Sequence, residues 1–253
     1  MWGDDDPGFE LGEEPEEAPE PVDPQDLMRA GLVFYGVMGC GALLWRMWTP
    51  GESIFHPSIA AAETAWSPLA AIGVGALAGL AAIAISEALT QWSDLGEALA
   101  DLLGEGVAGL SVADGILLAL ASGFAEEMFF RGALQPAVGL FWASLAFGAC
   151  HFMPRRELAL WSAFAVVMGV GFGALFEWTG QLAAPIAAHV VVNAVNLPRL
   201  GKRFEEKEAA ERAAQTAATT RLSDLGFGAR DGGSAAADEA AEKTSDNRDQ
   251  DGF

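Results

Sequence analysis

Residues 112–134 read VADGILLALASGFAEEMFFRGAL, an apolar segment that carries Glu126, Glu127 and Arg131 near its end. A helix of about 20 apolar residues can cross the hydrocarbon core of a bilayer, so this segment is long enough to span a membrane. Charged side chains are costly at that depth, and those that occur there usually serve a function. We therefore expect a membrane helix that carries part of a functional site.

Similar apolar segments flank this one on both sides, and together they predict an all-α fold, a polytopic membrane bundle of about six transmembrane helices. Residues 91–111 alternate acids with leucines, which indicates an amphipathic surface helix and not a span. Two glycine pairs at i, i+4 favour close packing between helices. They are Gly75 with Gly79 and Gly169 with Gly173. The predicted spans are residues 28–48, 66–90, 112–134, 137–153, 158–178 and 181–199.

Most of the charge lies near the two ends of the chain, which has 253 residues and a formal net charge of −21. Residues 1–27 are acidic and rich in proline, and residues 201–253 are polar and rich in Ala, Glu, Asp and Gly. Both compositions favour disorder because they offer little apolar surface to bury. We expect a membrane domain at residues 28–200 between two such tails. Their acidity would repel phosphate, so the sequence argues against a nucleic-acid partner.

Basic residues near the span ends predict the orientation of the chain in the cell membrane. Arg155 and Arg156 follow the fourth span, and Arg199, Lys202 and Arg203 follow the sixth. Two spans separate these clusters, so both should face the cytoplasm, together with both termini of this multi-pass protein.

Two further patterns place histidines within apolar spans, Phe147-x-x-x-His151 and His189-x-x-x-Asn193. Two of the three histidines in the chain are found here. Residues four apart lie on one helical face, so each pair can project together toward the interior of a bundle. Phe147 is more often a packing residue than a chemical one.

Helix geometry separates the roles of the two glutamates, because adjacent residues on a helix point about 100° apart. Glu127 can pair with Arg131 on one face, and this pairing lowers the cost of burying both charges. Glu126 then faces the working cavity, where a carboxylate beside an imidazole is a workable acid–base pair. Asn193 can donate a hydrogen bond to a developing oxyanion, and His189 can do the same or bind a metal.

The predicted topology contains a conflict of depth. Glu126 would lie in the outer half of the third span, which Pro136 is expected to end, whereas His151 would lie near the cytoplasmic end of the fourth. The two side chains can meet only if a helix is broken, tilted or shifted, which Pro136 and Pro154 permit.

The three patterns in this order resemble the motifs of the CPBP family, which groups CAAX prenyl proteases with Abi-type and bacteriocin-processing or immunity proteins. The resemblance covers about residues 70–200, and all seven motif positions match. It implies an intramembrane endopeptidase in which Glu126 and His151 activate water while His189 and Asn193 stabilise the oxyanion. The substrate would be a peptide or protein, with or without a lipid group.

The resemblance leaves the question of a metal open. Zinc is the alternative to glutamate-activated water, with Glu126, His151 and His189 as its candidate ligands. The sequence lacks the His-Glu-x-x-His zinc helix, so glutamate-activated water is favoured. Two other functions also stay open, a non-catalytic immunity or scaffold protein and, behind it, a proton-coupled transporter, for which membrane Glu and His are suited as well.

Overall fold

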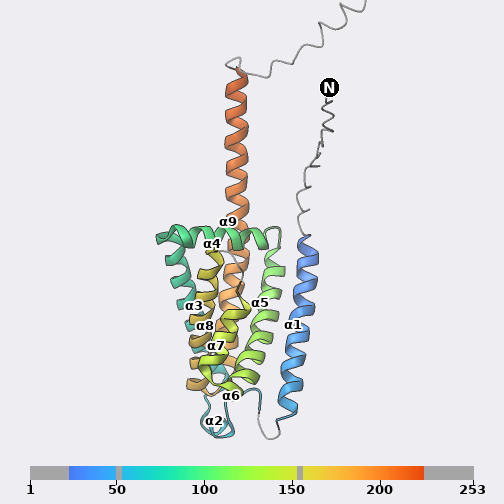
Figure 1. Cartoon of the computed structure of the whole chain (residues 1–253), viewed down its shortest axis with the longest axis vertical. Coiled ribbons are helices and arrows are strands. Elements are labelled where there is room, and N and C mark those ends of the chain that lie inside the picture. Colours follow the sequence, from blue (N-terminus) through green and yellow to red (C-terminus); the bar gives the residue numbers. More distant parts are fainter. Residues whose placement is uncertain (1–22, 50–52, 153–155, 225–253) are drawn as a thin grey trace, which may run out of the picture. The chain divides into compact units, whose positions relative to one another are not determined.

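The computed structural model describes residues 23–49, 53–152 and 156–224, and every element within these ranges is helical (Figure 1). The chain divides into two compact units, residues 1–205 and 206–253. The helices are α1 (Pro24–Met47), α2 (Ile59–Thr64), α3 (Pro68–Trp92), α4 (Asp94–Val107), α5 (Val112–Glu127), the π-helix η1 (Met128–Leu134), α6 (Gln135–Val138), α7 (Leu140–Cys150), α8 (Arg156–Thr179) and α9 (Ala183–Asp224).

Three of the described helices are long and apolar enough to cross a membrane. They are α1, α3 and residues 159–179 of α8, which agree with predicted spans to within about four residues. A fourth span arises if α4 and residues 112–138 are counted together, although the two are bent by 103°. The all-α prediction is confirmed, but the count of six spans is not. The predicted fourth span forms the short α7, and the predicted sixth forms the start of α9.

The surface of the apolar helices fits an integral membrane protein. On α1, Val33, Phe34 and Val37 are 67%, 57% and 68% exposed, and Leu69 on α3 is 80% exposed. Apolar surface of this extent is rarely left in water and is well suited to lipid. The predicted cytoplasmic orientation depends partly on Arg155, which lies outside the described residues, and it stays a prediction.

The amphipathic segment predicted at residues 91–111 forms α4, which lies across the ends of α3 and α5 (Figure 1). Gly109, with a φ of 79°, provides the sharp turn between α4 and α5. Ser111 then caps α5 in a capping box with Asp114. The turn and the cap together start the helix that carries the glutamate pair.

A hairpin at Gly139 removes the conflict of depth. Residues 112–138 run as one helical rod through α5, η1 and α6, so the prediction that Pro136 ends the third span is wrong. The rod ends at Gly139, whose φ of 85° favours glycine, and α7 then turns back along η1. Glu126 and His151 are nearly equidistant from Gly139 along the chain, so the two arms of the hairpin bring them to the same level.

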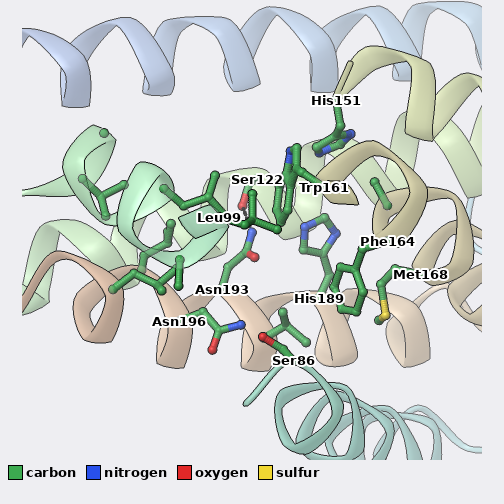
Figure 2. Close-up of a pocket in the computed structure, with 18 of the residues that line it drawn as sticks. Ser86, Leu99, Ser122, His151, Trp161, Phe164, Met168, His189, Asn193 and Asn196 are labelled. Atoms are coloured by element: carbon green, nitrogen blue, oxygen red, sulfur yellow. Dashed lines mark hydrogen bonds between the residues drawn. The ribbon is translucent and has the colours of Figure 1, made fainter. Parts of the chain in front are cut away.

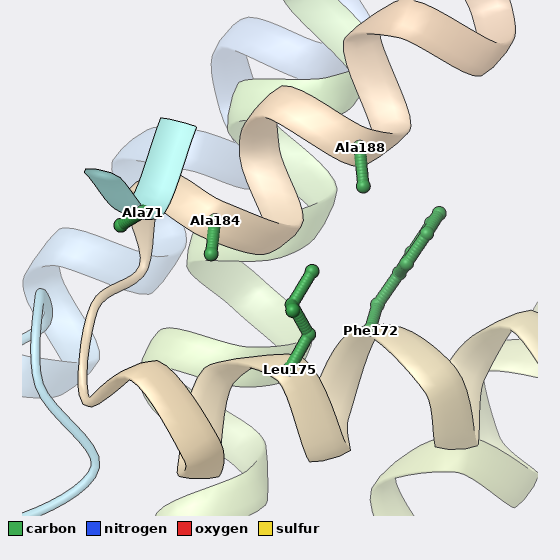
Figure 3. Packing of buried hydrophobic residues seen from close by; sticks show 5 residues of the cluster. All are labelled: Ala71, Phe172, Leu175, Ala184 and Ala188. Atoms are coloured by element: carbon green, nitrogen blue, oxygen red, sulfur yellow. The ribbon is translucent and has the colours of Figure 1, made fainter. Parts of the chain in front are cut away.

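Small residues allow α3, α8 and α9 to pack closely, and Figure 3 shows Phe172 and Leu175 of α8 projecting toward Ala184 and Ala188 of α9. A Cβ atom at Gly75 would lie 2.1 Å from the Ala184 carbonyl oxygen, and one at Gly79 would lie 2.6 Å from that of Ala188. The first glycine pair therefore serves helix packing within the chain. The second pair does so as well, since Gly169 and Gly173 face Ser144 and Gln135.

The boundary expected at residue 200 is not an end of helical structure, since α9 continues to Asp224. Alanine and glutamate favour helix in this stretch, and Glu208 pairs with Arg212 one turn later. The remainder of the predicted C-terminal tail, residues 225–253, and most of the N-terminal tail lie outside the described residues.

Candidate active site

Glu126, His151, His189 and Asn193 all line one cavity of about 410 Å³. They come from α5, from the residue that follows α7, and from α9. Figure 2 shows His151, His189 and Asn193 around this space, with Asn193 directed at Ser122. Three patterns that are separate in the sequence thus contribute to one cavity.

The first pair of interest is Glu126 with His151. Glu126 is 6% exposed, and its Oε2 lies 3.9 Å from His151 Nε2. That buried oxygen has no hydrogen-bond partner among the described residues. Buried polar atoms are seldom left unsatisfied, so an unpaired carboxylate oxygen facing a cavity indicates a place for water or substrate.

The backbone fixes the tautomer of His151. Its Nδ1 lies 2.7 Å from the carbonyl oxygen of Phe147, and a carbonyl can only accept a hydrogen bond, so Nδ1 carries the proton. In the neutral ring Nε2 is then an acceptor, and it faces the acceptor oxygen of Glu126. Two acceptors 3.9 Å apart cannot hydrogen-bond to each other, but both can accept a hydrogen bond from a single water molecule between them.

Glu127 makes the pair with Arg131 that the sequence predicted, and it also holds a site histidine. Its Oε1 accepts a hydrogen bond of 3.0 Å from Arg131 Nη1 and one of 2.8 Å from His189 Nδ1. Arg131 also donates to the carbonyl oxygen of Gly169 at 3.2 Å. The role of Glu127 is therefore wider than the structural ion pair that we expected, because it orients His189 as well.

Phe147 packs at the centre of this group and is 3% exposed. The Arg131 guanidinium carbon lies 4.3 Å from the centre of its ring, in a cation–π arrangement. The rings of His151 and His189 lie 4.6 and 6.1 Å away, centre to centre. Phe147 thus separates Arg131 from the cavity and supports both histidines, which fits its expected packing role.

The position of Asn193 depends on a residue that the sequence did not single out. Its Nδ2 donates a hydrogen bond of 2.9 Å to Ser122 Oγ, and Ser122, 3% exposed, donates in turn to the Ala119 carbonyl oxygen. Ser122 precedes Glu126 by one turn, so both face the same side of α5. That i, i+4 spacing is a signal from which Ser122 could have been found.

The rest of the cavity is mainly apolar. A band of leucines and aromatic rings extends from the acid–base pair toward α4, and the polar side chains Ser86 and Asn196 lie along it (Figure 2). An apolar cavity with a few polar groups is typical of a site for a small apolar ligand or segment. The apolar band is formed by Leu99, Leu103, Leu160, Trp161, Phe164 and Leu197.

The arrangement of the candidate zinc ligands gives little support to a metal centre. The described residues contain no group of three or more His, Cys, Asp or Glu side chains that could hold a metal ion. His189 Nδ1 binds Glu127 and His151 Nδ1 binds a carbonyl, an arrangement that leaves Nε2 of each ring available and does not itself argue against a metal. We therefore assign no reaction step to zinc, which stays a prediction for Glu126, His151 and His189.

Residues 108–195 match a family model described as type II CAAX prenyl endopeptidase Rce1-like. This segment resembles that family. The match confirms the family resemblance predicted from the three patterns, since the Rce1-like segment contains all seven motif residues. Its bounds enclose α5 to α8 and the first part of α9, whereas α1 and α3 lie outside it.

A second comparison gives a relative in Bacillus subtilis (strain 168), described as the uncharacterized protein YpbD. It is 48% identical over 82 residues, which is 32% of this chain and 42% of the relative. The chain thus aligns with less than half of the relative's length. No solved structure matches.

Proposed function

We propose that the chain is an intramembrane endopeptidase that hydrolyses peptide bonds near the membrane surface. The observation that carries the proposal is the separation of 3.9 Å between Glu126 Oε2 and His151 Nε2 inside a mainly apolar cavity. A carboxylate and an imidazole at this distance can hold one water molecule between them and accept its proton. The Rce1-like match adds support, because that family is one of endopeptidases.

In the reaction that we propose, water lies between Glu126 and His151 and attacks the carbonyl carbon of the scissile bond. One of its protons passes to Glu126 as the new C–O bond forms. The tetrahedral intermediate carries a negative oxygen that needs hydrogen-bond donors on the opposite side. When the C–N bond breaks, the proton returns from Glu126 to the leaving nitrogen, so that the products are a carboxyl group and an amine.

Asn193 and His189 are our candidates for the oxyanion donors. One hydrogen of the Asn193 amide is held by Ser122, which leaves the other free for the substrate. His189 gives its Nδ1 hydrogen to Glu127, so only Nε2 can reach the oxyanion. That role requires the imidazolium form of His189, which would share the single negative charge of Glu127 with Arg131.

The substrate that we propose is an apolar peptide segment, with or without a lipid group. The leucines and aromatic rings along the cavity favour an apolar chain, while Ser86 and Asn196 could bind its peptide groups. The Rce1-like family is described by its action on CAAX prenyl substrates, and a prenyl group would suit the same apolar walls.

The experiment is to incubate the purified wild-type chain and Glu126→Gln with a library of apolar peptides, each with and without a prenyl group. We expect cleavage by the wild type and a rate at least about a hundredfold lower for the variant, since a positioned general base contributes that much. A strong chelator added to parallel samples should leave the rate unchanged, and loss of activity restored by zinc would favour the metal alternative.

Two outcomes would reject the proposal. Cleavage by Glu126→Gln at the wild-type rate would remove its chemical basis. Binding of peptides without cleavage by the wild type would favour the non-catalytic scaffold or immunity protein.

A further inference from the structure

The helix α1 lies outside the Rce1-like segment but borders the candidate active site. It runs parallel to α5 and packs against it (Figure 1). A Cβ atom at Gly31 would lie 2.9 Å from Leu118 Cδ2, and one at Gly39 would lie 3.9 Å from the Ala125 Cβ atom. These close approaches define the face of α1 that meets α5.

Tyr35 lies on that face, one turn from each glycine, since residues four apart share one side of a helix. It is half-buried and lines the same cavity as Glu126 and His151. Its side chain also lies close enough to Glu126 for an electrostatic interaction between the two groups. A phenol hydroxyl beside a carboxylate can donate a hydrogen bond to it.

We infer that Tyr35 is a positioning residue for Glu126, so that α1 is part of the active site and not only a wall around it. This inference rests on the proposed function. A glutamate side chain has several rotatable bonds, and one donor on its carboxylate restricts their freedom. Held by Tyr35, Glu126 keeps its unpaired Oε2 directed at His151 Nε2, where the attacking water is placed.

The position of Tyr35 makes this role specific to its hydroxyl. The ring itself packs edge-on against Phe34, with 5.3 Å between ring centres, and Phe34 is 57% exposed. Removing the hydroxyl alone therefore leaves the ring and its packing in place. A hydrogen bond to a charged group is about twice as strong as a neutral one, so its loss should be measurable in the rate.

The kinetic test compares wild type, Tyr35→Phe and the control Phe34→Leu on the best peptide from the library. Tyr35→Phe should lower kcat about tenfold and change KM by less than about twofold, because the hydroxyl acts on the chemical step and not on substrate binding. Phe34→Leu should keep both parameters near wild type. Equal kcat in Tyr35→Phe and wild type would overturn the inference, as would a loss confined to KM.

A second measurement needs no activity. The chain contains a single tyrosine, so protein grown with 3-fluorotyrosine gives one tyrosine resonance in a fluorine NMR spectrum. Glu126→Gln removes the neighbouring charge with little change of shape and should shift that resonance. Glu63→Gln makes the same chemical change at an exposed carboxylate on α2 and should not.

The two measurements separate the possible failures. If the chemical shift of the resonance is the same in Glu126→Gln and the wild type, Tyr35 does not contact the carboxylate, whatever the protein's activity. A shifted resonance in a wild-type chain that cleaves no peptide would reject the proposed protease and retain the contact. If Tyr35→Phe does not fold in detergent, the fluorine spectrum of the folded wild type still decides between contact and no contact.

Discussion

His189 donates a hydrogen bond through Nδ1 to Glu127 Oε1 across 2.8 Å, and the same oxygen binds Arg131 at 3.0 Å. One carboxylate oxygen therefore connects a buried ion pair with a histidine of the candidate active site. The two adjacent glutamates differ accordingly. Each has one oxygen without a hydrogen-bond partner among the described residues, but that of Glu126 faces His151, whereas Glu127 is fully buried and holds two other residues in place through its second oxygen.

The first prediction concerns that shared oxygen. Glu127→Gln keeps the shape of the side chain but removes the charge that balances Arg131, which is 1% exposed. Breaking a buried pair in this way costs about 3–5 kcal/mol, so the variant should unfold at a clearly lower temperature in detergent than the wild type. Glu126→Gln is the matched control and should unfold near the wild-type temperature. Equal unfolding temperatures for Glu127→Gln and the wild type would contradict a structural role of the pair.

A second prediction concerns the support of Asn193. Ser122→Ala removes the hydroxyl that accepts from Asn193 Nδ2, so the amide loses its fixed orientation. A neutral hydrogen bond contributes about 1 kcal/mol, and kcat should fall about fivefold. The measurement is a double-mutant cycle with Asn193→Ala. If the serine acts through the asparagine, the double variant should be no slower than Asn193→Ala alone. Additive losses would show that the two residues act separately.

Phe147 allows a prediction about packing. Phe147→Ala would open a cavity beside Arg131 and remove the ring that faces its guanidinium at 4.3 Å. The free energy of unfolding should fall by about 3–5 kcal/mol, as for other buried aromatic residues. Phe141→Ala, on the same helix but 66% exposed, is the control and should have a much smaller effect. Thermal unfolding of both variants in one detergent checks this difference, and similar losses in the two would contradict it.

The hairpin gives a fourth prediction, in which the backbone alone is changed. A Cβ atom at Gly139 would meet no other atom within 4 Å, but the φ of 85° is unfavourable for alanine. Gly139→Ala should therefore cost about 1–3 kcal/mol of stability through strain. Gly171→Ala is the matched control, because its Cβ atom would also lie in open space but within the helix α8. There alanine should be neutral or stabilising by up to about 1 kcal/mol. A loss of equal size in both variants would show that the turn is not the cause.

Hydropathy and length were sufficient to predict the helices that cross the apolar layer without interruption. The spans predicted at 28–48, 66–90 and 158–178 agree with α1, α3 and α8, since a long apolar run has few other stable structures. Between residues 112 and 153 a turn near Pro136 was predicted between two spans, but the chain turns back at Gly139 and the second arm is the short α7. A single glycine within apolar sequence does not indicate whether a helix bends, packs or ends.

The charged residues of the site could also be predicted from the sequence. Burying a charge in a membrane helix costs free energy, so a charge found there usually serves a function. The different directions of Glu126 and Glu127, about 100° apart, follow from helix geometry alone. The bond from His189 to Glu127 was not predictable, since it depends on how α9 packs against α5. Ser122 and Tyr35 were missed for a different reason. A neutral hydroxyl is inexpensive within a membrane helix, so neither residue draws attention by its cost, and only the spacing of Ser122 from Glu126 offered a signal.

The hairpin at Gly139 has a consequence for related chains. One residue inserted between Glu127 and Gly139 would rotate Glu126 by about 100° and move it along the rod, away from His151. The interval from the glutamate pair to the histidine that corresponds to His151 should therefore be nearly constant wherever this turn is kept. The loops before α5 and after α7 are free to vary. Counting that interval in a newly found sequence offers a simple way to tell a chain that can bring the glutamate to the histidine from one that has the motif residues at the wrong spacing.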